Sequence, residues 1–199
     1  MVRTFFLAII FLTVISSSAQ MLDSIKNSFN YQPVFFIKLD TRNSFISSYS
    51  VKLRGVKAGL NYNNITKIGL GYSWMNPDYK SVYNTDTVEF KMNIFSTFIE
   101  YTFYRTDKIY AEIPVHLGIS KLSYLKEDNL LLSTFALVYE PAMIVEYRAF
   151  KFFGIGMGAG YRLVLYNHQQ INEMLSSPIY IFRFKVYFGD IYKQHLKKQ

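Results

Sequence analysis

Cysteine is absent from this chain of 199 residues, and tryptophan occurs once. The lack of cysteine excludes disulfide bonds, thiolate metal sites, cysteine nucleophiles and a lipid anchor on an N-terminal cysteine. Charged residues are also scarce, at 18% of the chain, whereas half of the residues are apolar and Tyr and Phe number 17 and 18. So large an apolar and aromatic content excludes intrinsic disorder. The length fits a single domain or a small barrel.

Long apolar runs are missing as well, apart from a short one at the N-terminus. Arg3, the apolar stretch 5–15 and the small residues Ser17 and Ala19 before Gln20 are typical of a cleaved secretory signal. The alternative is an uncleaved anchor helix, although this stretch is shorter than the roughly 20 residues that a spanning helix needs. We therefore expect a signal peptide at 1–19 and a barrel domain at 20–199 that ends in a short basic tail.

Beyond the signal, bulky apolar residues alternate with small or polar ones. Ile68, Leu70, Tyr72 and Trp74, for example, alternate with Gly69, Gly71 and Ser73. This period of two predicts β-strands, and the apolar faces of neighbouring strands coincide when the strands are paired as antiparallel hairpins. We expect eight strands, at 34–41, 46–62, 67–76, 88–103, 109–123, 133–148, 152–166 and 178–188.

The alternation changes phase at two places. Val51 and Leu53 are odd-numbered whereas Val56 is even, and a similar change falls near Ile94 and Phe95. A β-bulge adds one residue to a strand and shifts the phase of its side chains. We therefore expect a bulge at Gly55.

Charged strand residues share one face with glycines, opposite the bulky face. The charged set is Lys38, Asp40, Lys57, Glu100, Glu112, Glu140, Glu146, Arg148, Arg162, Arg183 and Lys185, and the glycines are Gly154, Gly156, Gly158 and Gly160. A soluble lipocalin-like barrel would enclose the aromatic face, and a membrane barrel would enclose the charged face. Small residues beside large ones suit the narrow interior of an eight-stranded barrel, which favours the membrane barrel.

Short connections at 63–66, 104–108 and 149–151 alternate with longer ones at 75–87, 124–132 and 167–177, as in outer-membrane barrels.

Several segments resemble segments of a known family of barrel proteins. They are Leu39-Asp40-Thr41-Arg42-Asn43-Ser44-Phe45, Gly69-Leu70-Gly71-Tyr72, Gly158-Ala159-Gly160-Tyr161-Arg162 and Pro178-Ile179-Tyr180-Ile181. Together with the signal and the eight strands, they make the chain similar to the small OmpA/OmpX-type outer-membrane barrels of Gram-negative bacteria, including uncharacterised barrels of that kind. The resemblance implies an all-β, eight-stranded, antiparallel up-and-down transmembrane barrel. Its implied partners are outer-membrane lipids and the barrel-insertion machinery, and we expect a monomer. The chain does not end on a terminal Phe, so recognition for insertion would depend on the strand 180–188.

The charged face predicts a lumen network of Lys57, Glu100, Glu112, Glu140, Glu146, Arg148, Arg162, Arg183 and Lys185. We expect Glu100 and Glu112 to face each other directly, where they repel unless a cation lies between them. Arg162 should pair diagonally with Glu140. Gly154, Gly156, Gly158 and Gly160 should make room for the long charged side chains. Such ion pairs would leave no open pore; the alternative is a wet interior that only solvates these charges.

Catalytic and cofactor motifs are not found. The glycines at 154–160 do not follow the G-x-G-x-x-G spacing, and His116, His168 and His195 lack the spacing of metal ligands. We expect no cofactor and no bound metal. The net charge of +8 is scattered over the sequence, which does not indicate nucleic-acid binding.

These patterns favour a structural, adhesive or surface-interaction protein that is not an enzyme. Two alternatives stay open. The first is a soluble exported lipocalin-like ligand-binding barrel. The second is a lipid-modifying barrel enzyme, in which His168 would act near Glu173, Ser176 and Ser177.

Overall fold

A computed structural model describes residues 20–46, 49–76, 79–83, 86–127, 129–150, 152–165 and 174–186. A helix over 20–28 precedes the strands. The strands are β1 (Val34–Ile46), β2 (Tyr49–Tyr62), β3 (Thr66–Met75), β4 (Tyr79–Tyr83), β5 (Asp86–Arg105), β6 (Ile109–Lys126), β7 (Asn129–Tyr147), β8 (Phe153–Leu165) and β9 (Ser177–Val186). The predicted signal peptide, the basic tail, His168 and Glu173 lie outside the described residues. In the described part of the chain, no helix has the length and apolar character needed to cross a membrane.

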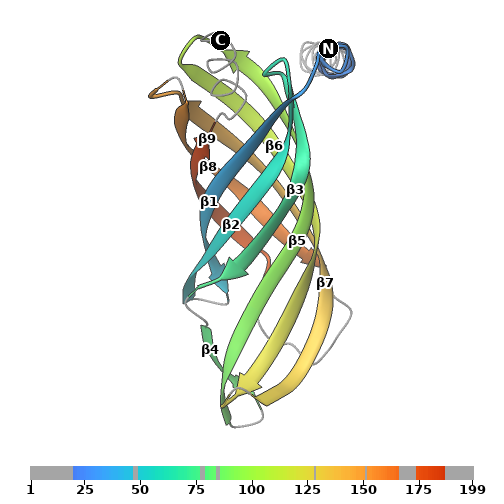
Figure 1. Ribbon diagram of the computed structural model, residues 1–199. Coiled ribbons are helices and arrows are strands. Elements are labelled where there is room, and N and C mark those ends of the chain that lie inside the picture. The colour runs from blue at the N-terminus through green and yellow to red at the C-terminus, as the bar shows by residue number, and fades with distance from the viewer. Residues whose placement is uncertain are drawn as a thin grey trace, which may run out of the picture.

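Eight of these nine strands form a closed ring. The antiparallel order is β3-β2-β1-β9-β8-β7-β6-β5, and pairing between β3 and β5 closes it. The strands are tilted around the ring, and β1 begins at the same end at which β9 finishes (Figure 1). We call this the turn end, because the short connection 63–65 lies there, and the opposite end is the loop end. The predicted eight-stranded antiparallel barrel is confirmed.

The remaining strand, β4, lies outside the ring and pairs with β5 at the loop end. The segment 75–87 was expected to be a loop, and so was 124–132, where β6 and β7 stay paired as far as Lys126 and Asn129. Both expectations are wrong, because main-chain pairing continues through these segments: β4 pairs with β5, and β6 stays paired with β7. As a result β5, β6 and β7 contain 20, 18 and 19 residues. With β4 they form a projecting wall beyond the ends of β1 to β3 (Figure 1).

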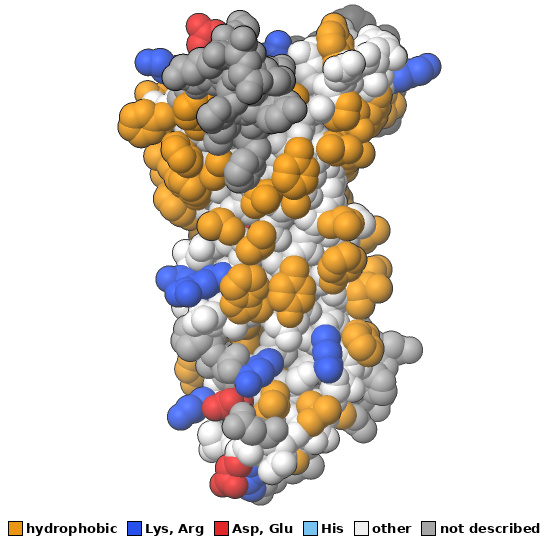
Figure 2. Space-filling view, viewed as in Figure 1, with side chains coloured by type: hydrophobic (Ala, Val, Ile, Leu, Met, Phe, Trp, Pro, Cys, Tyr) orange, Lys and Arg blue, Asp and Glu red, His pale blue; other side chains and the backbone are white. Residues whose placement is uncertain are grey.

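Large apolar side chains cover the outer face of the ring. Leu70 and Val145, for example, are 53% and 49% exposed. Figure 2 shows hydrophobic side chains over the middle of the barrel, with Lys and Arg more frequent towards the loop end.

Burial alternates along β2 without a break from Val51 to Leu60, and the registers of β2 with both neighbours are continuous. The predicted bulge at Gly55 is therefore wrong; a register shift lies in β5 instead, between Thr102 and Tyr104.

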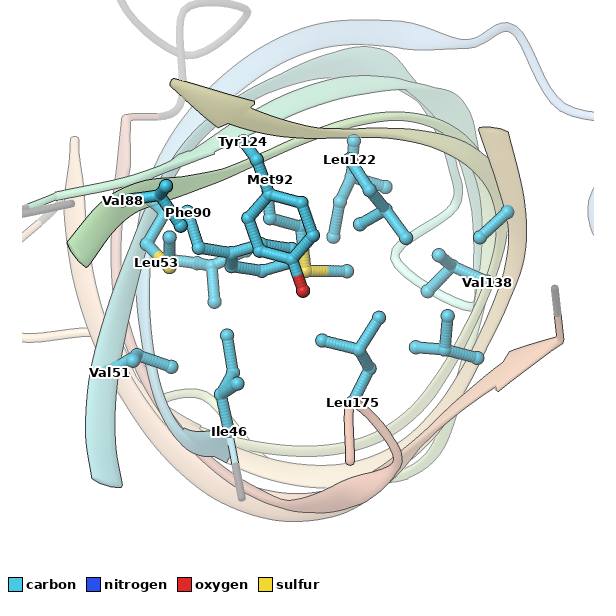
Figure 3. Close-up of a cluster of buried hydrophobic side chains, with 14 residues drawn as sticks. Ile46, Val51, Leu53, Val88, Phe90, Met92, Leu122, Tyr124, Val138 and Leu175 are labelled. Carbon is cyan, nitrogen blue, oxygen red and sulfur yellow. The ribbon is translucent and has the colours of Figure 1, made fainter. Parts of the chain in front are cut away.

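The change of phase has a different cause: the apolar face itself changes sides. Towards the loop end of β2, Val51 and Leu53 point inwards and are buried, while Lys52 and Arg54 point outwards. The inward apolar residues at the loop end form one group, which we call the apolar cluster (Figure 3). It contains Ile46, Val51, Leu53, Met75, Val88, Phe90, Met92, Ile94, Leu122, Tyr124, Ala136, Val138, Val164 and Leu175. The barrel is therefore apolar outside over most of its length, but apolar inside at its loop end.

Candidate functional site

The interior between the turn end and the apolar cluster collects the buried charges, and every strand of the ring supplies at least one. These residues are Lys38, Asp40 and Arg42 (β1), Lys57 (β2), Lys67 (β3), Glu100 (β5), Glu112 and His116 (β6), Glu140 and Glu146 (β7), Arg162 (β8), and Arg183 and Lys185 (β9). Because inward and outward positions alternate along a strand, residues distant in sequence meet on the barrel axis. We call this set the ionic column.

Arg183 holds the part of the column nearest the turn end. Its Nη2 donates to Glu100 Oε1 over 3.0 Å, and its Nη1 donates to Glu112 Oε2 over 3.1 Å. Lys38 pairs with Glu100 and Lys67 pairs with Glu112. Each carboxylate thus has cationic partners on two sides, which buried carboxylates require.

The two carboxylates do not face each other directly, contrary to expectation. In the register of β5 with β6, Glu100 lies opposite Pro114 and Glu112 lies opposite Thr102. The expected pairing was two residues out of register. The offset leaves Arg183 between the two carboxylates, as the cation that this arrangement was expected to need.

Asp40 organises the middle of the column. Its Oδ2 accepts hydrogen bonds from Lys57 Nζ at 2.7 Å and from the Arg42 guanidinium at 3.3 Å. Lys57 Nζ also lies 2.9 Å from Nε2 of His116. One carboxylate therefore ties β1 to β2, and Lys57 extends the contact across the lumen to β6.

Arg42 and Arg162 hold the part of the column nearest the apolar cluster. Both guanidinium groups pair with Glu140, and Arg162 Nη1 donates to Ser44 Oγ at 3.2 Å. Ser44 in turn shares a 2.7 Å hydrogen bond with Ser177. The contact between Arg162 and Glu140 is the diagonal pair that the sequence suggests.

Aromatic rings fill the space beside the ammonium groups at the turn end. The Nζ of Lys38 lies 4.3 Å from the ring centroid of Phe98, and the Nζ of Lys185 lies 5.6 Å from that of Phe36. Lys185 also pairs with Glu146 at 3.0 Å. Cation–π contacts of this kind stabilise a charge that has lost part of its hydration.

Eight of the nine residues named for the lumen network lie in the column; Arg148 does not. It follows the end of β7 at the turn end and is half-buried. The charged face expected from the sequence included Lys38 and Asp40 but left out Arg42, because the first strand was expected to end at 41. It also left out His116 and Lys67, the first residue of the strand expected at 67–76. The continuing alternation Lys38, Asp40, Arg42 is a signal that identifies Arg42 as inward-facing.

Gly158 of β8 has a different role from the expected one. A Cβ on Gly158 would lie 2.2 Å from the carbonyl oxygen of Met143, so this glycine permits close approach of β8 to β7. Room for charged side chains comes instead from Gly71 and Gly55. A Cβ at Gly71 would lie 2.8 Å from Lys57 Cγ, and one at Gly55 would lie 2.7 Å from Asp40 Oδ1.

The chemistry of the column is that of paired charges. Asp40 Oδ1, His116 Nδ1 and Arg183 Nε are buried with no hydrogen-bond partner, and such polar positions suit ordered water. Within the described ranges, no group of three or more His, Cys, Asp or Glu residues is arranged to hold a metal ion. The column can cross-link the strands and occupy the lumen, and towards the loop end it is followed by the apolar cluster, in which most side chains offer an ion no polar partner.

The fold is shared with several solved structures. Neisserial surface protein A superimposes with a TM-score of 0.64 at 14% identity, covering 77% of this chain and 96% of that one. The N-terminal β-barrel domain of Pseudomonas aeruginosa OprF gives 0.52 at 11% identity, with coverages of 78% and 98%. Ail, the attachment invasion locus protein of Yersinia pestis, solved with the heparin analogue sucrose octasulfate, gives 0.50 at 10% identity, with coverages of 78% and 98%.

Comparison by sequence gives no further relative. Neither a protein-family model nor a curated protein sequence matches the chain. The structural likeness establishes that the chain has the fold of the small eight-stranded outer-membrane β-barrels, which cross the membrane with their strands.

Proposed function

We propose that the chain is an outer-membrane protein with a closed lumen, which acts as a membrane-anchored scaffold for contacts at the cell surface. The closed lumen is supported by the sequence of side-chain types along the barrel interior. An ionic column contributed by all eight ring strands is followed, towards the loop end, by the apolar cluster. An ion on this path would have to break buried ion pairs and then pass a mostly apolar region, and both steps are costly.

The surface role is supported by the projecting wall. A transmembrane strand needs about 9–11 residues, and β5, β6 and β7 are far longer than that. Near the tip of the wall, Leu130 and Leu131 are 58% and 47% exposed. Exposed apolar side chains at such a tip suit contact with another surface. The fold likeness to a Neisserial surface protein and to an attachment protein is consistent with this role.

Planar-bilayer recording tests the closed lumen. The purified native barrel should insert without giving a large, stable single-channel conductance. An Arg162→Gln variant should stay silent too, because the apolar cluster remains in place. A large and stable conductance from the native protein would contradict the proposal.

A cell-adhesion assay tests the surface role separately. Cells that display the Leu130→Asn, Leu131→Asn double variant should adhere less than cells that display the native barrel. Tyr49→Asn is the matched control, because Tyr49 is exposed at the loop end of β2, outside the projecting wall. Equal adhesion of all three strains would contradict a contact role for the tip of the wall.

A further inference from the structure

The outer face of β2, β3, β5 and β6 changes character between two adjacent rows of paired residues. In the first row Val56, Tyr72, Phe95 and Ile119 lie side by side on consecutive strands, and all four are exposed apolar residues. Two positions nearer the loop end, the next outward row consists of Arg54, Trp74, Asn93 and Lys121. The outer face thus passes from apolar to basic or polar on β2, β5 and β6, with Trp74 at the boundary on β3.

Basic side chains continue beyond this boundary. Lys52 and Lys91 lie two residues further along β2 and β5. We call Lys52, Arg54, Lys91 and Lys121 the basic patch. Glu89 lies 3.9 Å from Lys91 and compensates part of its charge, whereas no described acidic side chain forms an ion pair with Lys52, Arg54 or Lys121. Lys52, Arg54 and Lys121 are therefore exposed cations that can bind an anionic ligand.

An apolar groove lies on the other side of the boundary, along the same strands. Its volume is about 520 Å³, and it is lined by Phe35, Ala58, Gly59, Leu60, Ile68, Gly69, Leu70, Thr97 and Phe98. Ala58, Leu70 and Thr97 form the outward row immediately after the row of Val56, Tyr72 and Phe95. The groove exists because small side chains and the paired glycines Gly59 and Gly69 lie between larger ones.

We propose that this face binds one phosphorylated lipid of the outer leaflet, with its phosphates on the basic patch and an acyl chain in the groove. Arg54 and Lys121 are three strand steps apart, about 14 Å, so two phosphate groups on one headgroup can be held together. Trp74 lies between them in the row, at the polar–apolar boundary that tryptophan prefers. A soluble polyanion would leave the groove unused, which is why a lipid is the occupant. This inference depends on the proposed outer-membrane location.

Native mass spectrometry of the detergent-solubilised full barrel tests the proposal, with diphosphoryl lipid A as the probe. The native protein should retain one lipid, and its affinity should fall roughly thirtyfold in the Arg54→Gln, Lys121→Gln double variant. Ala58→Phe, which fills the groove with an apolar ring, should also weaken binding. The matched controls are Arg105→Gln with Lys108→Gln, exposed bases at the turn end, and Ala159→Phe, an outward alanine on β8. Both controls should retain the lipid.

Competition identifies the source of the phosphate. Neither inorganic phosphate nor a soluble sulfated oligosaccharide should displace the lipid at equal concentration. Displacement by either, unchanged binding in the patch variant, or equal loss in the controls would overturn the proposal. Heat-modifiable gel mobility of each variant reports folding and insertion independently, so failed lipid binding by a folded barrel contradicts this inference alone.

Discussion

At the scale of single residues, Arg183 has the largest consequence. It is fully buried and bridges Glu100 and Glu112, which come from adjacent strands, and no other described cation contacts both. A buried ion pair adds little net stability when compared with an apolar substitute, but removing one partner leaves a buried charge uncompensated. The bridge therefore fixes how β9 sits against β5 and β6 across the lumen.

We predict that Arg183→Gln lowers the free energy of unfolding by about 3–5 kcal/mol, because two buried carboxylates lose their shared partner. Urea unfolding in detergent micelles or lipid vesicles measures this change. Arg105→Gln is the matched control, since Arg105 is exposed and donates a hydrogen bond to the carbonyl oxygen of Asn63. Similar losses for both variants would show that the bridge has no special role.

Outward-facing residues in the apolar band should tolerate a charge poorly, because they face lipid. Leu70→Arg should cost roughly 2–4 kcal/mol, because it places a charge on the lipid face within the apolar band. Tyr49→Arg should cost little, since Tyr49 is exposed at the loop end, beyond the row where the outer face becomes polar. The same unfolding measurement compares the two, and equal tolerance would count against a lipid-facing surface at Leu70.

At the scale of strands, the period of two is sufficient to predict the ring. The eight ring strands, their antiparallel pairing and the inward face all follow from alternation, because a strand exposes its two faces to different surroundings. The alternation of Phe135, Leu137 and Tyr139 with Ala136 and Val138, for instance, holds in β7 as the sequence predicts.

Alternation alone could not show why the apolar residues of β2 change from odd-numbered to even-numbered positions. Val51 and Leu53 are inward where the outside is polar, and Val56 is outward where the outside is apolar. Both arrangements read as the same apolar alternation, shifted by one residue, so the sequence alone suggests a bulge. Alternation predicts the ion pair between Arg162 and Glu140 on neighbouring strands, but not pairs across the lumen. Arg183 meets Glu100 through the barrel interior, from strands that are not neighbours in the ring.

The glycines of β8 give a test at this scale. Gly158→Val should slow folding and destabilise the barrel, because its side chain would collide with the β7 main chain at Met143. Gly156→Val is the matched control: the nearest atoms to its Cβ would lie 3.4 Å away, at ordinary contact distance. The rate of the shift in gel mobility during refolding into vesicles separates the two. Equal behaviour would contradict the role of Gly158 in close strand packing.

At the scale of the whole molecule, the barrel consists of two parts with opposite polarity. From the turn end to the row of Arg54 and Trp74, the outside is apolar and the inside holds the ionic column. Beyond that row, the outside of β2, β3, β5 and β6 is mostly basic and polar, and the inside holds the apolar cluster. A membrane supplies the apolar surroundings that the first part needs, and water supplies those of the second. The position of the membrane boundary is therefore the central claim.

Trp74 reports that boundary directly, because it is the single tryptophan of the chain. The measurement is quenching of its fluorescence in vesicles that contain lipids brominated at different depths. Trp74 should be quenched most by bromines near the headgroups. In a Trp74→Phe background, a Leu70→Trp variant should be quenched most by bromines deeper in the acyl chains. Quenching of Trp74 that is strongest at the bilayer centre, or absent at every depth, would contradict a membrane boundary at the row of Arg54 and Trp74.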